Sequence, residues 1–134
     1  MKRYWIALTV LTVDCALIML LLFIFARHLF LPASLVMVLY FGVITAVQHS
    51  IVVSKAQKDA RDFIRSFLGI IVATLVIHIV VLMTYDFTHL QKAKIFTLSF
   101  SILFLIFNVF EMVSLYIFIN RQRKEYIEQN KEEQ

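Results

Sequence analysis

The hydrophobic positions of this chain fall into four long runs separated by short polar segments. The runs cover about residues 4–26, 29–53, 67–85 and 95–119. Each is close to the roughly 20 apolar residues that cross a bilayer core of about 30 Å. Inside lipid a backbone must satisfy its own hydrogen bonds, and the runs lack the alternation typical of strands, so helices are expected. The pattern predicts an all-α, four-helix transmembrane bundle that forms a single integral membrane domain over residues 1–134.

Composition supports this class and excludes the soluble ones. The chain is 61% hydrophobic and 16% charged, with a mean hydropathy of +0.85. A soluble domain averages about 45–50% apolar and about 25% charged residues. The first run is longer than the apolar region of a signal peptide, and no small-x-small cleavage site follows near Arg27, so we expect it to remain as a span.

The Lys and Arg residues between the runs are distributed unevenly, and this predicts the orientation. Arg27, Lys92 and Lys94 flank one face, whereas the other carries Lys2, Arg3, Lys55, Lys58, Arg61, Arg65, Arg121, Arg123, Lys124 and Lys131. Because positive residues favour the cytoplasmic side, both termini are expected there. The net charge of +4 belongs to this asymmetry. No basic helix face carries interleaved aromatics, so no nucleic-acid partner is expected.

The segments on the expected cytoplasmic side are predicted to extend the helices. In the link 54–66, apolar residues recur at helical spacing, at Ala56, Ala60, Phe63 and Phe67. Oppositely charged pairs four residues apart support a helix there and in the tail 120–134. The link could continue the flanking helices, lie on the membrane surface as an amphipathic helix, or form a solvated loop. We predict a helix with a cytoplasmic docking surface made by Lys58, Arg61 and Arg65.

Four polar residues lie inside the predicted membrane core. Asp14 and His78 lie roughly 15 and 16 Å from the cytoplasmic ends of their runs, and Glu111 roughly 12 Å, at 1.5 Å per residue. Asn108 precedes Glu111 by three residues and shares its face. The similar depths predict that Asp14, His78 and Glu111 meet inside the bundle. Such a cluster could be structural, could carry protons or cations, or could contact a partner membrane protein.

Other chemistry is not indicated. Gln48 and His49 lie near a helix end, where water and headgroups can satisfy them, and Tyr4 and Trp5 resemble interfacial anchors. The histidines lack the spacing of a metal site, so no metal or cofactor is expected. No nucleophile elbow, phosphate loop or nucleophile–base arrangement is present in the sequence, so we do not expect an enzyme.

Two segments resemble a divergent branch of the ATP synthase protein I family. They are Lys58-x-x-Arg61-x-Phe63-Ile64-Arg65-x-Phe67 and Leu105-Ile106-Phe107-Asn108-Val109-Phe110-Glu111, and the likeness covers about residues 55–120. The resemblance implies an accessory role in assembling the membrane rotor ring of the F-type ATP synthase, together with a contribution to divalent cation supply. The chain departs from this branch at Thr74, where members carry a Lys.

Two alternatives remain open. Length and the carboxylate of the first run also resemble small multidrug-resistance-type transporters, which would make Asp14 a proton or cation site. The chain could also be a structural subunit of a larger respiratory or secretion assembly. The expected partners are therefore membrane lipids and another membrane protein, either the rotor-ring subunit or a component of such an assembly.

Overall fold

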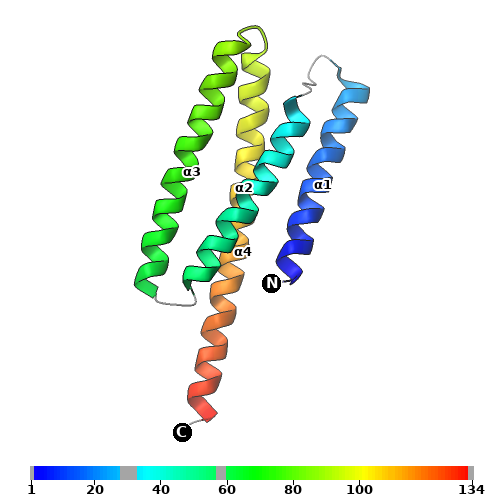
Figure 1. Cartoon of the computed structure of the whole chain (residues 1–134). Helices are drawn as coiled ribbons and strands as arrows, with labels where there is room; N and C mark the ends of the chain where they lie inside the picture. The colour runs from blue at the N-terminus through cyan, green and yellow to red at the C-terminus, as the bar shows by residue number, and fades with distance from the viewer. Residues whose placement is uncertain (1, 28–32, 57–59, 133–134) are drawn as a thin grey trace.

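The computed structural model describes residues 2–27, 33–56 and 60–132. These residues form four α-helices: α1 (Lys2–Phe25), α2 (Ala33–Ala56), α3 (Ala60–Thr88) and α4 (Ala93–Glu132) (Figure 1). All four are long and apolar enough to cross a membrane. The prediction of an all-α four-helix bundle is confirmed, and the chain is a multi-pass membrane protein.

Successive helices run in opposite directions. One end of the bundle holds the start of α1, the end of α2 and the start of α3, and the tail of α4 leaves the bundle there. Both termini therefore lie at this end (Figure 1). Because Lys2, Arg3, Lys55, Arg65 and Arg121 lie at this end, we call it the basic end. At the opposite end a tight turn connects α3 to α4, closed by the Lys92 amide, which donates to the His89 carbonyl at 3.0 Å.

Two helices are longer than the apolar runs that predicted them. Helix α3 begins at Ala60 rather than at 67, and α4 continues to Glu132 rather than ending at 119. The apolar run marks only the part of a helix that lipid can cover, whereas the amphipathic flanks continue the same backbone. The predicted helical link is thus confirmed for 54–56 and 60–66, and residues 57–59 lie outside the described part of the chain.

The core of the bundle is the seam between α2 and α4. On α4 the buried positions recur every three or four residues, at Phe96, Phe100, Leu103, Phe107, Glu111 and Leu115. From α2, the Phe41 ring lies 4.8 Å from that of Phe100 and 5.7 Å from that of Phe107, measured between centroids. These interlocking rings fix the rotation of α4 against α2, which decides which polar residues face inward.

The two other helices pack on this seam from opposite sides. Helix α3 contacts both α2 and α4, while α1 packs on α2, on the side away from α3 (Figure 1). The close contact of α1 is at Gly42, where an added Cβ would lie 3.1 Å from the Thr12 hydroxyl oxygen. Only Leu8, Cys15 and Met19 of α1 are buried. Most of α1 therefore presents its side chains to the surroundings of the bundle.

Candidate functional site

A buried carboxylate on α4 connects three helices. The Glu111 side chain lies on the seam, and its Oε1 is 3.0 Å from His49 Nδ1 of α2. Its Oε2 accepts a hydrogen bond of 2.9 Å from the Tyr4 hydroxyl of α1. We call Tyr4, His49 and Glu111 the Glu111 triad. Both carboxylate oxygens have partners, which meets the need of a polar group buried in a bilayer.

The two donors of the Glu111 triad also hold each other in place. The rings of Tyr4 and His49 stack with centroids 3.4 Å apart and planes 8° from parallel. The Tyr4 hydroxyl also lies 3.4 Å from the Thr45 carbonyl, but it has one proton and the shorter distance assigns it to Glu111. The start of α1 is thereby attached to the α2–α4 seam through polar contacts.

The Glu111 triad lies between two hollows. Glu111 lines a cavity of about 30 Å³ together with Gln48 and Asn108, which is large enough for a water molecule. His49 and Tyr4 line a groove of about 350 Å³ near the basic end of the bundle. The carboxylate and the imidazole thus border different spaces and are joined by one short hydrogen bond.

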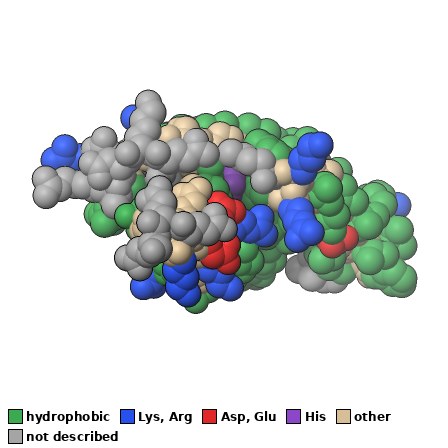
Figure 2. Space-filling model, turned by 90° about the horizontal axis from the view of Figure 1, so that it is seen from below, with side chains coloured by type: hydrophobic (Ala, Val, Ile, Leu, Met, Phe, Trp, Pro, Cys, Tyr) green, Lys and Arg blue, Asp and Glu red, His purple; other side chains and the backbone are tan. Residues whose placement is uncertain are grey.

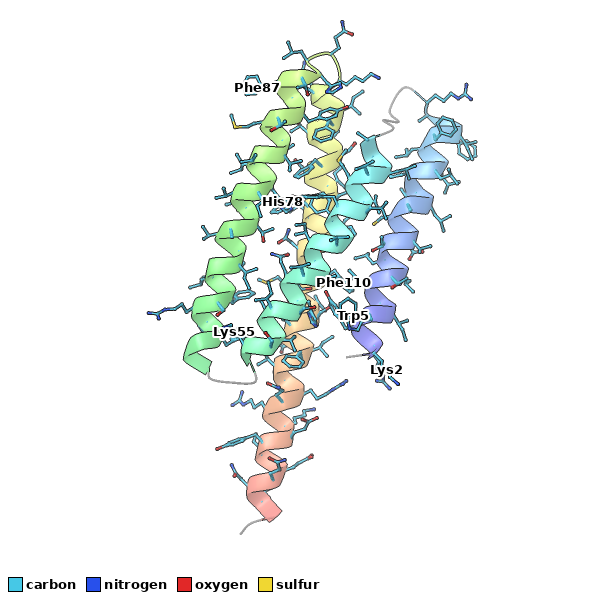
Figure 3. The ribbon with its side chains drawn as sticks, viewed as in Figure 1. Lys2, Trp5, Lys55, His78, Phe87 and Phe110 are labelled. Atoms are coloured by element: carbon cyan, nitrogen blue, oxygen red, sulfur yellow. The ribbon has the colours of Figure 1, made fainter. Side chains whose placement is uncertain are left out.

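His78 is a core histidine, separate from the Glu111 triad. It points from α3 toward α2 and α4 (Figure 3), where it lies against the rings of Phe41, Phe100 and Phe104. Its Nδ1 is 2.7 Å from the Thr74 carbonyl oxygen, which can only accept, so Nδ1 carries the proton and donates. The predicted pairing of His78 with Asp14 or Glu111 is wrong, because a bond within α3 and an aromatic pocket already satisfy the ring.

Asp14 is also separate. Its side chain is exposed on α1, and within residues 2–27, 33–56 and 60–132 it has neither a hydrogen bond nor an ion pair. The reason is rotation about the helix axis, since Asp14 precedes the buried Cys15 by one residue, a turn of about 100° at 3.6 residues per turn. The prediction that Asp14, His78 and Glu111 meet is therefore wrong, although their depths are similar.

Asn108 is neither buried like His78 nor without a hydrogen bond like Asp14. It is exposed, and its amide nitrogen donates to the Phe104 carbonyl of its own helix at 2.8 Å. It follows the buried Phe107 by one residue and so lies beside the seam. It still lines the small cavity with Glu111, so these two members of the predicted cluster do share a space.

The sequence interpretation missed His49 and Tyr4 as partners of Glu111. We expected headgroups and water to satisfy His49, but it is buried in the bundle. Tyr4 is an aromatic residue near a helix end, as expected, and it also donates a hydrogen bond to Glu111. A signal was available in the spacing, because Phe41, Thr45 and His49 follow one another at four-residue intervals. Their shared face placed His49 on the buried stripe of α2.

The predicted docking surface is described only in part. Arg65 is exposed on α3, near the basic end. Lys58 lies outside the described residues, and only the backbone of Arg61 is described, at the start of α3. In the part of the chain that the structure describes, no group of three or more His, Cys, Asp or Glu side chains could hold a metal ion.

Comparison with known proteins adds no relative to this picture. No protein-family model matches the chain, and neither a curated protein nor a solved structure is significantly similar to it.

Proposed function

We propose that this chain is a non-catalytic accessory protein of the bacterial inner membrane, with both termini in the cytoplasm. Its role would be to assist the assembly or stability of the membrane rotor ring of the F-type ATP synthase, as the resemblance to the ATP synthase protein I family implies. The observation that carries the proposal is Asp14, a carboxylate exposed near the middle of α1.

The position of Asp14 is costly unless another molecule meets it. It follows Tyr4 by ten residues, roughly 15 Å along α1. A charged carboxylate at the bilayer centre costs about 2.5–3.5 kcal/mol even on the scale derived from insertion experiments. The neighbouring Val10, Leu17 and Ile18 are exposed and apolar. An acidic group within an aliphatic face is suited to a membrane helix that supplies a hydrogen-bond donor and covers the surrounding side chains.

The rest of the bundle supports an accessory role. The Glu111 triad is satisfied by contacts within the chain, so it needs no ligand to exist. The two segments that carry the resemblance also converge, because Phe67 and Glu111 line the same small cavity. The motif residues thus act together in holding α3 and α4, and the exposed face of α1 around Asp14 remains available to a partner.

The test is co-purification from the native membrane in a mild detergent. A tagged chain should retain rotor-ring subunits, and Asp14→Asn should lose them while accumulating normally. Ser101→Ala is the matched control, since Ser101 is an exposed polar residue on α4 that bonds only within its helix, to the Thr97 carbonyl.

A second readout is the ratio of assembled ring to free ring subunit in cells that lack the gene. Complementation by the natural chain should restore the ring, and Asp14→Asn should not. Retention of subunits from a different respiratory or secretion assembly would replace this proposal with the structural-subunit alternative. If Asp14→Asn retains the rotor-ring subunits as well as the natural chain does, Asp14 on α1 is not the contact with the partner.

The second candidate function is proton or cation transport, and the geometry favours Glu111 over Asp14 as its carboxylate. Glu111 borders the small cavity while its partner His49 borders the groove at the basic end. Purified chain in liposomes would then conduct protons or couple cation flux, and Glu111→Gln would abolish that flux. Absence of flux with the natural chain correctly folded would exclude this candidate.

A further inference from the structure

A groove between α1 and α4 at the basic end has the composition of a ligand site. Its volume is about 350 Å³, and its lining comes from α1, α2 and α4: Arg3, Tyr4, Ala7, His49, Ser114, Ile117, Phe118 and Arg121. Neither Asp nor Glu lines it. It therefore combines positive charge with apolar walls, which distinguishes it from the small cavity on the other side of Glu111.

The two arginines of the groove have no ion-pair or hydrogen-bond partner among the described residues. Arg3 and Arg121 are exposed, and neither makes an ion pair or a hydrogen bond with the residues that the structure describes. Figure 2 shows Lys and Arg side chains gathered at this end of the molecule. Guanidinium groups bind phosphate oxygens through paired, charge-assisted hydrogen bonds. The groove therefore favours an anionic ligand with several acceptor oxygens.

One neutral donor, the Ser114 hydroxyl, extends the same surface inward. Ser114 lines the groove, and within the described residues its hydroxyl has no hydrogen-bond partner. His49 uses Nδ1 toward Glu111 and presents the rest of its ring to the groove. Tyr4 is committed to Glu111 and adds its ring to the wall. Donors thus outnumber acceptors along the groove, as an anion requires.

The polar and apolar parts are arranged along the membrane normal. Ser114, Ile117 and Arg121 follow one face of α4 at spacings of three and four residues, over roughly 10 Å. Arg121 lies toward the C-terminal tail of α4, whereas Ile117 and Phe118 precede it on the side of the membrane-crossing part. A ligand that fills the groove would have its charge at the interface and its apolar part in the hydrocarbon.

We propose that this groove binds the phosphate headgroup of an anionic phospholipid, with Arg3 and Arg121 on the phosphate and an acyl chain along Ile117 and Phe118. Basic pockets between transmembrane helices are suited to such headgroups. The bound lipid would link α1 to α4 at the basic end, next to the Glu111 triad. The proposal does not depend on the proposed function.

The first experiment uses native mass spectrometry of the full chain released from mixed micelles of phosphatidylglycerol and phosphatidylcholine. We expect retained phosphatidylglycerol, and at least a tenfold loss of that preference in Arg3→Gln/Arg121→Gln. The matched control is Lys55→Gln/Arg65→Gln, which removes two exposed positive charges at the same end but outside the groove. Equal losses in both variants would mean general electrostatic attraction and would overturn the proposal.

A second experiment does not require the arginine variants to fold. The chain contains one Trp, so Trp5→Phe with Phe118→Trp places a single fluorophore in the groove. Brominated phosphatidylglycerol should quench it more strongly than brominated phosphatidylcholine at equal mole fraction, and equal quenching would overturn the proposal.

Inorganic phosphate is added as a competitor. Failure to displace the lipid supports a phospholipid ligand, whereas displacement at millimolar phosphate would show a site for free phosphate and overturn the assignment to lipid.

Discussion

Glu111 and Asp14 are both carboxylates at similar depth in the membrane, and the bundle treats them in opposite ways. Glu111 is buried on the α2–α4 seam and accepts hydrogen bonds from two other helices. Asp14 is exposed on α1 among aliphatic side chains. Depth makes each carboxylate costly, and the rotation of its helix decides whether the chain itself or another molecule offsets that cost.

The difference follows from where each carboxylate lies around the axis of its helix. Glu111 continues the seam four residues after Phe107, so it inherits the rotation fixed by the packed rings. Asp14 lies one residue before Cys15, and a single step turns it out of the contact with α2. A structural carboxylate and one available to a partner can thus arise from the same chemistry, and four variants test that distinction.

The largest effect is expected from Glu111→Ala. It leaves the buried His49 donor and the half-buried Tyr4 hydroxyl without their acceptor, and a buried donor left unsatisfied costs about 1–3 kcal/mol. The free energy of unfolding, measured by steric trapping in detergent, should fall by about 2–4 kcal/mol, as expected for two donors left without an acceptor. The double change His49→Leu/Glu111→Leu should recover most of it. A loss below about 0.5 kcal/mol, the range of surface substitutions, would contradict a structural role for Glu111.

The next effect concerns how α1 is held. A side chain at Gly42 meets the Thr12 hydroxyl, so Gly42→Leu should destabilise the bundle by about 1–3 kcal/mol through overpacking. Gly69 on α3 is the control, because nothing lies within 4 Å of an added Cβ there. Gly69→Leu should leave stability unchanged or raise it by up to about 1 kcal/mol, the usual cost of Gly in a helix. Equal losses at the two glycines would contradict a close contact at Gly42.

A smaller effect is expected at the α2–α3 contact. Gln48 Nε2 donates to the Thr74 hydroxyl at 2.8 Å, and Thr74→Val removes that acceptor while keeping the carbonyl bonded to His78. Interhelical hydrogen bonds in membranes average about 0.6 kcal/mol, so the unfolding free energy should fall by that amount. Thr84→Val is the control, since the exposed Thr84 hydroxyl bonds only to the Val80 carbonyl within α3. An equal loss in the control would assign the effect to the Thr-to-Val exchange itself.

The smallest effect on folding is expected at Asp14. Asp14→Leu removes no hydrogen bond or ion pair within the described chain, so the unfolding free energy in detergent should change by no more than about 0.5 kcal/mol, as for other surface positions. The same variant should lose the partner proposed above. A loss of stability comparable with that of Glu111→Ala would show that the two carboxylates do not differ as described.

The four helices could be predicted from the sequence because hydrophobic length is a strong and local signal. Long apolar runs such as Phe67 to Tyr85 match the thickness of a bilayer core, and the charge pairs in the tail correctly predicted the extension of α4. Helix ends were predicted less well, since the run ends where lipid ends and the backbone at Ala60 is already helical.

The candidate site was harder to predict because it depends on rotation and on partners distant in sequence. Equal depth suggested that Asp14 and Glu111 share a location, although hydropathy carries no information on which face meets a neighbour. The pairing of His49 with Glu111 joins residues 62 positions apart. The four-residue stripe through Phe41 gave the correct face for His49, but only aromatic packing between α2 and α4 brings Glu111 to it.

Helix α4 has a mechanical consequence. It has 40 residues and is about 60 Å long at 1.5 Å per residue, twice a bilayer core of about 30 Å, so its tail projects well past the other helices (Figure 1). Because one unbroken helix forms both the seam and the projecting tail, a force on the tail is transmitted along the helix to the seam. A protein that binds the tail would therefore act on the same helix that holds Glu111 against His49.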